Sequence, residues 1–273
     1  MNLKRFEQLI LATVLLAALP ATAQVGPEET DAAKIMAAVQ NRAEGDKVKG
    51  RMVMTIADGA GRERSRSVTT RSMLFEGGKR QIIVFDDPAD VKGTGLLSTD
   101  YDDGDKDDDQ WLYLPSLHKS TRISSSDKSG SFMGTAFSYA DMTEQDPKHW
   151  DYSILQASVK VGEDNCWIIE AKPKTEKAAK ETGYLKTQIA VSKSKLMPLR
   201  VKAWVVKGKK IKEIAFDDIR QVDGLWVAHT LTARILKGEE LDLSTVIKFA
   251  DLTFNNADVG EDLFSQRQLE KGL

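Results

Sequence analysis

Three histidines and a single cysteine are the first residues to consider for catalysis, because an activated nucleophile needs a base beside it. His118, His149 and His229 are the only histidines of the chain. None stands in a recognisable catalytic setting, since the chain has no G-x-S-x-G elbow, no H-E-x-x-H pair and no phosphate-binding glycine loop. His229 lies between Val227 and Leu231 on the apolar face of a predicted strand, which favours a hydrogen-bonded core histidine. The sequence therefore predicts a protein that is not an enzyme.

A dense acidic run is the strongest candidate for metal binding. Residues 100–109 contain seven aspartates, and Ca²⁺ prefers carboxylate oxygens as ligands. A helix-loop-helix calcium loop needs acids at alternate positions before its glycine, whereas Gly104 is preceded there by Asp103, Tyr101 and Thr99. The run is therefore interpreted as a solvated acidic hairpin tip. Cys166 has no partner for an intrachain disulfide and is expected to be buried and inert. The sequence predicts no metal and no cofactor.

The first residues have the pattern of a secretory signal peptide. Lys4 and Arg5 precede an apolar stretch over residues 9–19, which is too short to span a bilayer and ends before small residues at 21–23. The interpretation is a cleavable signal peptide over residues 1–23, with the mature protein soluble in the periplasm and residues 24–273 forming one domain. The formal net charge is only −2, without a basic stripe. Nucleic-acid binding is therefore not expected.

After the first residues, the chain has one segment with helical periodicity and then alternates apolar and polar residues with a period of two. Residues 31–42 are expected to form a helix that starts at Thr30 or Asp31, and from Gly50 onwards apolar and polar residues alternate. Turn signals join consecutive strands as hairpins, so we expect an antiparallel meander. The thirteen candidate strands are 50–56, 62–75, 81–85, 95–98, 110–114, 120–123, 152–161, 166–171, 184–191, 199–206, 211–216, 226–236 and 241–250.

One face of these strands is apolar and the other is charged. A long meander with one apolar face must cover that face by curling or by packing another element on it. The two predicted helical stretches, 31–42 and the 139–144 region, are too short to cover a large sheet. We therefore expect a concave apolar surface that holds a ligand. The residues predicted to line it are Met52, Met54, Ile56, Trp111, Tyr113, Leu185, Val201, Val205, Leu243 and Ile247. The alternative for the methionines is that they fill an ordinary closed core.

A central stretch carries a resemblance to a known family. It runs from Trp-Leu-Tyr-Leu-Pro at 111–115, through Arg-Ile at 122–123 and a serine-rich loop, to Ser-Phe-Met-Gly at 131–134 and Phe-Ser-Tyr-Ala-Asp-Met at 137–142. This order resembles the outer-membrane lipoprotein-sorting (LolA-like) proteins, and the similarity extends over the mature chain. The resemblance implies a mainly β fold, a half-open antiparallel β-barrel of about eleven strands with short helices as a lid over the concave face.

Two functional hypotheses follow from the sequence and the resemblance. The first is a periplasmic carrier that binds the acyl chains of a lipid or lipoprotein and moves them between the inner and outer membranes, to an outer-membrane acceptor. The second is a non-catalytic accessory subunit that docks on an inner-membrane RND-type exporter and carries no lipid. In that case an exposed aromatic loop containing Phe132 and Phe137 would contact the exporter.

Overall fold

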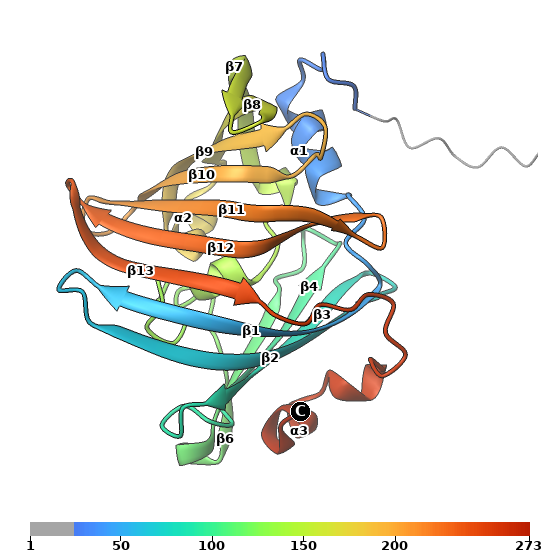
Figure 1. The fold of residues 1–273 in the computed structure, drawn as a ribbon, viewed down its shortest axis with the longest axis vertical. Helices are drawn as coiled ribbons and strands as arrows, with labels where there is room; N and C mark the ends of the chain where they lie inside the picture. Colours follow the sequence, from blue (N-terminus) through green and yellow to red (C-terminus); the bar gives the residue numbers. More distant parts are fainter. Residues whose placement is uncertain (1–24) are drawn as a thin grey trace, which may run out of the picture.

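Thirteen antiparallel strands form one sheet in the computed structural model, which describes residues 25–273 (Figure 1). The predicted signal peptide, residues 1–23, and the expected mature start at Gln24 lie outside the described residues. In sequence order the strands are β1 (Lys47–Asp58), β2 (Glu63–Phe75), β3 (Gly78–Asp87), β4 (Gly95–Tyr101), β5 (Asp109–Leu114), β6 (Lys119–Arg122), β7 (Trp150–Val161), β8 (Asp164–Pro173), β9 (Tyr184–Ser192), β10 (Pro198–Val205), β11 (Lys210–Val222), β12 (Leu225–Lys237) and β13 (Glu240–Phe249). The mainly β prediction is confirmed.

The helices are few and short. Three α-helices occur in the described residues: α1 (Ala32–Gln40), α2 (Glu176–Thr182) and α3 (Gln266–Lys271). Single turns of 3₁₀ helix form η1 (Pro115–Leu117), η2 (Tyr139–Met142), η3 (Pro147–His149) and η4 (Glu261–Leu263). Across residues 25–273, we find no helix with the length and apolar character needed to cross a membrane.

The strand order corrects the expected simple meander. Two meanders, β1 to β6 and β7 to β13, join where β1 pairs with β13 in the middle of the sheet, with Met54 opposite Ile247. This arrangement makes β6 and β7 the two outer edges, although they are consecutive along the chain. The connection between them, residues 123–149, must therefore pass from one edge of the sheet to the other. We call residues 123–149 the crossing segment.

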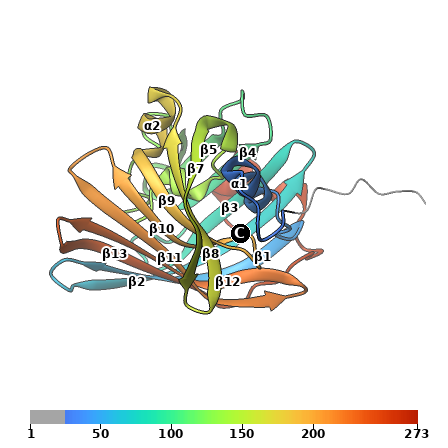
Figure 2. The same ribbon diagram turned by 90° about the horizontal axis from the view of Figure 1, so that it is seen from above.

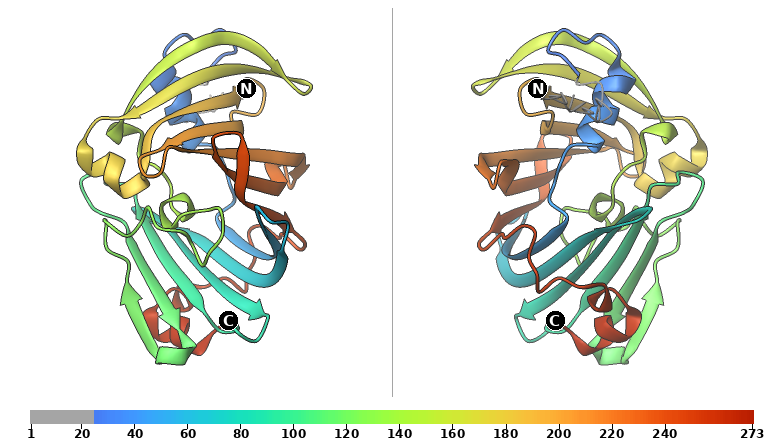
Figure 3. Two further views of the ribbon diagram at one scale, coloured as in Figure 1. Left: turned by 90° about the vertical axis from the view of Figure 1, so that its left-hand side faces the viewer. Right: turned by 90° about the vertical axis from the view of Figure 1, so that its right-hand side faces the viewer.

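The sheet curls without closing, and the crossing segment runs through its interior (Figure 3). Along β1, the buried residues Met52, Met54 and Ile56 alternate with more exposed neighbours, so this face is turned inwards. Helix α1 lies beside β7 to β9 (Figure 2), and its Ile35 belongs to a buried cluster with Trp167 of β8 and Val191 of β9. The half-open antiparallel barrel predicted from the sequence is confirmed.

The outer face is apolar too, beneath the C-terminal helix. Met73, Ile82, Val84 and Leu97 on β2 to β4 form a buried cluster with Leu269 of α3. Strand β3 is therefore covered on both faces, in agreement with its continuous apolar run at 82–85. The helices do not all serve as a lid, because α3 lies on the outside of the sheet.

The N-terminal cap of α1 gives a first testable prediction. The carboxylate of Asp31 accepts hydrogen bonds from the backbone N–H groups of Ala33 and Lys34, at 2.9 and 3.2 Å. The Asp31→Ala substitution leaves these donors without their side-chain acceptor, so we expect the free energy of unfolding to fall by about 1 kcal/mol. Urea denaturation measures the loss. A matched Asp151→Ala substitution on the exposed side of β7 should change it by less than about 0.5 kcal/mol.

Candidate ligand-binding site

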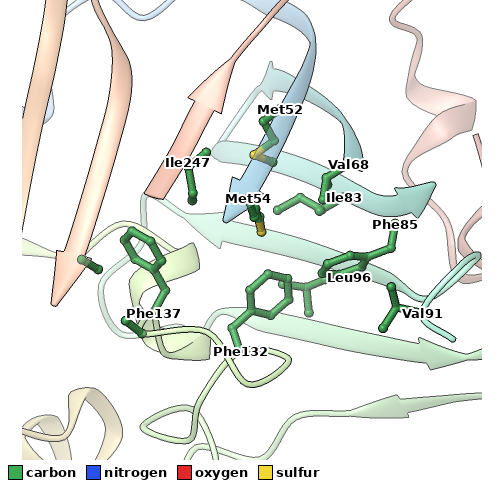
Figure 4. Packing of buried hydrophobic residues seen from close by; sticks show 12 residues of the cluster. Met52, Met54, Val68, Ile83, Phe85, Val91, Leu96, Phe132, Phe137 and Ile247 are labelled. Carbon is green, nitrogen blue, oxygen red and sulfur yellow. The ribbon is translucent and has the colours of Figure 1, made fainter. Parts of the chain in front are cut away.

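The crossing segment fills one half of the curled sheet with aromatic side chains. Phe132 and Phe137 are 1% and 4% exposed and belong to the same buried cluster as Met52, Met54 and Ile247 (Figure 4). The ring of Phe132 lies 5.8 Å from that of Phe85 and 5.6 Å from that of Tyr139, centroid to centroid. This half of the interior is packed by the protein's own residues.

Hydrogen bonds to the sheet fix the crossing segment in place. The Arg66 guanidinium donates to the carbonyl of Met133 at 2.6 Å, the amide of Gln110 donates to the carbonyl of Tyr139 at 2.9 Å, and the backbone N–H of Ala136 donates to the hydroxyl of Thr245 at 2.9 Å. These contacts satisfy backbone groups that would otherwise be buried without partners. They hold the segment from strands on both sides of the β1–β13 junction.

A buried ion pair joins the crossing segment to the opposite wall. Lys212 Nζ on β11 lies 2.6 Å from Asp141 Oδ2, and these two side chains are 6% and 9% exposed. Lys212 Nζ also donates to the hydroxyl of Tyr184 at 2.9 Å, and that hydroxyl donates to Asp141. Burial, followed by the charge of Asp141, raises the pKa of Tyr184 well above its ordinary value. Tyr184 therefore stays protonated and serves as a donor.

The other half of the interior contains an apolar cavity of about 620 Å³. Its wall combines strands β7 to β13, α1 and the end of the crossing segment with a few residues of β1 to β4. The apolar or mainly apolar side chains around it include Met36, Val39, Phe137, Met142, Trp150, Tyr152, Ala171, Tyr184, Ile189, Met197, Val201, Ala203, Ile214, Phe216, Val227, Leu231, Phe249, Leu252 and Phe254. The volume and lining are typical of a small-molecule pocket.

A second, polar cavity of about 980 Å³ adjoins the first. Both are lined by Arg42, Glu44, Lys79, Asp100 and Glu144, which therefore surround the place where the two meet. We call these five residues the charged neck. Lys79 Nζ lies 2.7 Å from Glu44 and 3.0 Å from Glu144. Burial acts to lower the pKa of Lys79, but the charges of Glu44 and Glu144 outweigh it and raise that pKa.

The residues predicted to line a ligand surface fall into separate groups. Val201 borders the apolar cavity. Met52, Met54, Leu243 and Ile247 face the interior but pack against the crossing segment. Ile56 is buried at 2% exposure, and Val205 packs beside Trp150 and Tyr184. Met52 and Met54 are packed in a core with the crossing segment, which is the alternative that the sequence left open for them.

Trp111, Tyr113 and Leu185 do not border either cavity. Trp111 and Tyr113 pack on the outer face of β5 in the cluster beneath α3, because Gln110 and Leu112 take the inward positions of that strand. Leu185 is 57% exposed. The pairing with β10 shifts at this point: Trp204 lies opposite Lys186 and Val205 opposite Tyr184, so Leu185 has no partner and Tyr184 points inwards.

The prediction of an exposed aromatic loop is wrong, because Phe132 and Phe137 are buried.

The sequence analysis also missed Lys212, Asp141 and the charged neck. One signal was present for Lys212, which shares its strand face with the apolar residues Ile214 and Phe216. A lysine in such a position indicates a buried partner. No local pattern pointed to Asp141 as that partner.

His229 and the acidic run, two features weighed for catalysis and metal binding, have defined places in the structure. His229 is 8% exposed, and its Nδ1 lies 3.2 Å from the carbonyl oxygen of Asp218. This is the hydrogen-bonded core histidine that the sequence predicts. Among the described residues, no group of three or more His, Cys, Asp or Glu side chains is arranged to hold a metal ion. Part of the acidic run faces inwards, since Asp100 is 9% exposed and lines both cavities.

Comparison with solved structures identifies the class of fold. A domain described as an outer-membrane lipoprotein-sorting domain from Vibrio parahaemolyticus is 29% identical, with a TM-score of 0.78, and the match covers 88% of this chain and 98% of that one. A DUF1329 family protein from Desulfovibrio piger is 29% identical with a TM-score of 0.77, covering 87% and 97%. A LolA superfamily protein from Nitrosomonas europaea is 16% identical with a TM-score of 0.65, covering 88% and 99%.

The chain thus has the open antiparallel barrel of the LolA-like proteins. A family model described as "Uncharacterized protein" matches residues 77–271, and the chain belongs to that family. A search of curated proteins found no match.

Proposed function

We propose that the protein is a non-catalytic periplasmic carrier, which shields the acyl chains of a lipid or lipoprotein in its apolar cavity during transfer between the inner and outer membranes. The observation that carries this proposal is the apolar cavity of about 620 Å³ bounded by α1, the crossing segment and the inner face of the sheet, mainly β7 to β13. Burying an acyl chain is favourable by about 0.8 kcal/mol for each methylene group. Such a cavity therefore gives strong binding without any charged contact.

Two further observations support a carrier. The Vibrio parahaemolyticus domain, whose fold this chain shares over most of its length, is described as lipoprotein-sorting. The cavity is also bounded by α1 and by the crossing segment, which are separate from the sheet and attached to it by side-chain contacts. A displacement of either element would widen access to the cavity without breaking strand pairing. Release to an acceptor at the outer membrane would use such a displacement.

The accessory-subunit alternative has no comparable observation in its favour. It requires an exposed aromatic surface at Phe132 and Phe137, and both side chains are buried against the sheet. Docking of the carrier on an inner-membrane RND-type exporter is compatible with acyl-chain binding and would then involve other surfaces.

The affinity of alkyl ligands should increase with chain length. Displacement of a fluorescent fatty acid by a series of ligands with one head group measures this dependence. We expect each added methylene group to tighten binding about fourfold until the cavity is filled, because each is worth about 0.8 kcal/mol of burial. A flat dependence on chain length, or no binding at any length, would contradict the proposal.

Two residues of one strand provide the matched control. Ile189 lines the apolar cavity and Leu185 is exposed outside it. Ile189→Asn introduces an amide into the apolar wall and should weaken binding of every ligand in the series about tenfold. Leu185→Asn makes the same chemical change away from the cavity and should leave the series unaltered. Equal effects of the two substitutions would show that the alkyl chain binds elsewhere.

A further inference from the structure

Unpartnered polar atoms gather on one part of the inner face. In the part of the chain that the structure describes, four buried side-chain atoms have no hydrogen-bond partner: Thr70 Oγ1, Ser98 Oγ, Asp100 Oδ1 and Gln110 Oε1. They belong to β2, β4 and β5, with β3 lying between β2 and β4, and Ser98 pairs directly with Gln110. Buried polar groups normally have partners. Of the four, only Thr70 and Asp100 belong to residues that line the apolar cavity, where a ligand could supply the missing partner.

Asp100 is the residue of this group that reaches both cavities. It is 9% exposed, and its Oδ1 has no hydrogen-bond partner. Its cross-strand neighbour Lys79 is held by Glu44 and Glu144 instead. Burial, and then the charges of Asp108 and Glu144, raise the pKa of Asp100 well above its ordinary value. Its Oδ1 thus lies where the two cavities meet without a hydrogen-bond partner, and a protonated amine beside it would both fill that place and favour the ionised carboxylate.

The polar cavity beyond the neck is strongly acidic. Ten aspartates and glutamates line it against five lysines and arginines. Several of the bases are already paired, among them Lys79 at the neck and Lys128, which lies 2.7 Å from Glu181. An anionic phosphate or carboxylate placed here would meet like charges in a partly desolvated space, which is unfavourable. A cation would gain from the same surroundings.

We propose that the charged neck is a head-group subsite and that the ligand is an amphiphile with a protonated amine, which donates to Asp100 while its alkyl chain occupies the apolar cavity. This inference rests on the proposed function and adds to it the chemical class of the head group. Selection against anionic lipids then follows from the acidic polar cavity.

Three probes with one tail length and different heads test the proposal. Dodecylamine, the dodecanoyl ester of glycerol and dodecanoate are titrated below their micellar concentrations by displacement of a fluorescent alkyl probe. We expect dodecylamine to bind at least about tenfold more tightly than dodecanoate, with the uncharged ester between them, because a charged hydrogen bond is worth about 1.5–3 kcal/mol. Equal affinities for all three, or tighter binding of dodecanoate, would overturn the head-group proposal.

The Asp100→Asn substitution is the matched test of the residue. Asparagine keeps the shape and one acceptor oxygen but has no charge. We expect it to weaken dodecylamine binding about tenfold and to leave the ester nearly unchanged, whereas Asp90→Asn, at an exposed position, should change neither. An unchanged preference for the amine in Asp100→Asn would assign the selectivity to other residues and overturn the role of Asp100. Failure of all three probes to bind would instead contradict the carrier function itself.

Discussion

The Lys212→Met variant is expected to lose about 3–5 kcal/mol of folding free energy. Asp141 is 9% exposed and its carboxylate lies 2.6 Å from Lys212 Nζ, so the substitution leaves a buried negative charge without its cation. The remaining partners of Asp141 are the Tyr184 hydroxyl and the backbone N–H of Ser138. These hydrogen bonds offset only part of the cost. The loss is large compared with the total stability of a typical domain.

Urea denaturation of two further variants separates charge from packing. Lys202→Met, on the exposed face of β10, makes the same chemical change and should cost less than about 0.5 kcal/mol. Asp141→Asn combined with Lys212→Met removes both charges and should recover a large part of the loss, because no uncompensated charge remains. A loss below about 1 kcal/mol in Lys212→Met alone would show that this ion pair does not hold the crossing segment against β11.

The Val201→Trp/Ile214→Trp variant is expected to bind alkyl ligands at least about a hundredfold more weakly than the original protein. Val201 and Ile214 are directly opposite on β10 and β11, and both line the apolar cavity. Two indole rings at these positions occupy space that an alkyl chain would use. Excluding about four methylene groups removes about 3 kcal/mol of burial, which corresponds to the stated loss of affinity.

The matched control places tryptophan outside the cavity. Leu185→Trp, on the neighbouring strand β9, adds an indole where the side chain is exposed and should retain the original affinity. Isothermal titration with a dodecyl ligand measures all three proteins, and thermal unfolding verifies that each is folded. Equal affinity of the double variant and the original protein would show that the ligand does not lie between β10 and β11.

The strands could be predicted because their determinants are local. In β1 the alternation of Met52, Met54 and Ile56 with Arg51, Val53 and Thr55 marks a half-buried strand, and glycine-containing turns separate it from its neighbours. The resemblance of the 111–142 stretch added the open barrel, which periodicity alone does not distinguish from a closed one.

The crossing segment could not be predicted in the same way. Residues 123–149 have no period, and the side to which they turn depends on β6 and β7 being opposite edges of the sheet. That pairing is set by the contact of β1 with β13, which lie far apart in sequence. Phe132 and Phe137 were therefore assigned to an exposed loop, although the topology places them inside.

The alternation of side chains within β5 could be predicted from the sequence, but the face that turns inwards could not. Trp111 and Tyr113 share one face of the strand, and period two does not say which face is inward. Because α3 covers the outer face with Leu269, large aromatic residues are buried there as well. The cavity is formed by several strands together, so no single strand pattern predicts it. Of the residues predicted to line a ligand surface, only Val201 borders it, and Phe137 from the predicted contact loop borders it too.

Native mass spectrometry tests most directly whether the apolar cavity holds a lipid. The protein is purified without detergent from the cells that produce it naturally. We expect a bound species with the mass of an acyl-bearing lipid, which is released on denaturation and is missing from the Val201→Trp/Ile214→Trp variant purified in parallel. Consistently empty protein that also takes up no alkyl ligand in vitro would contradict the carrier function.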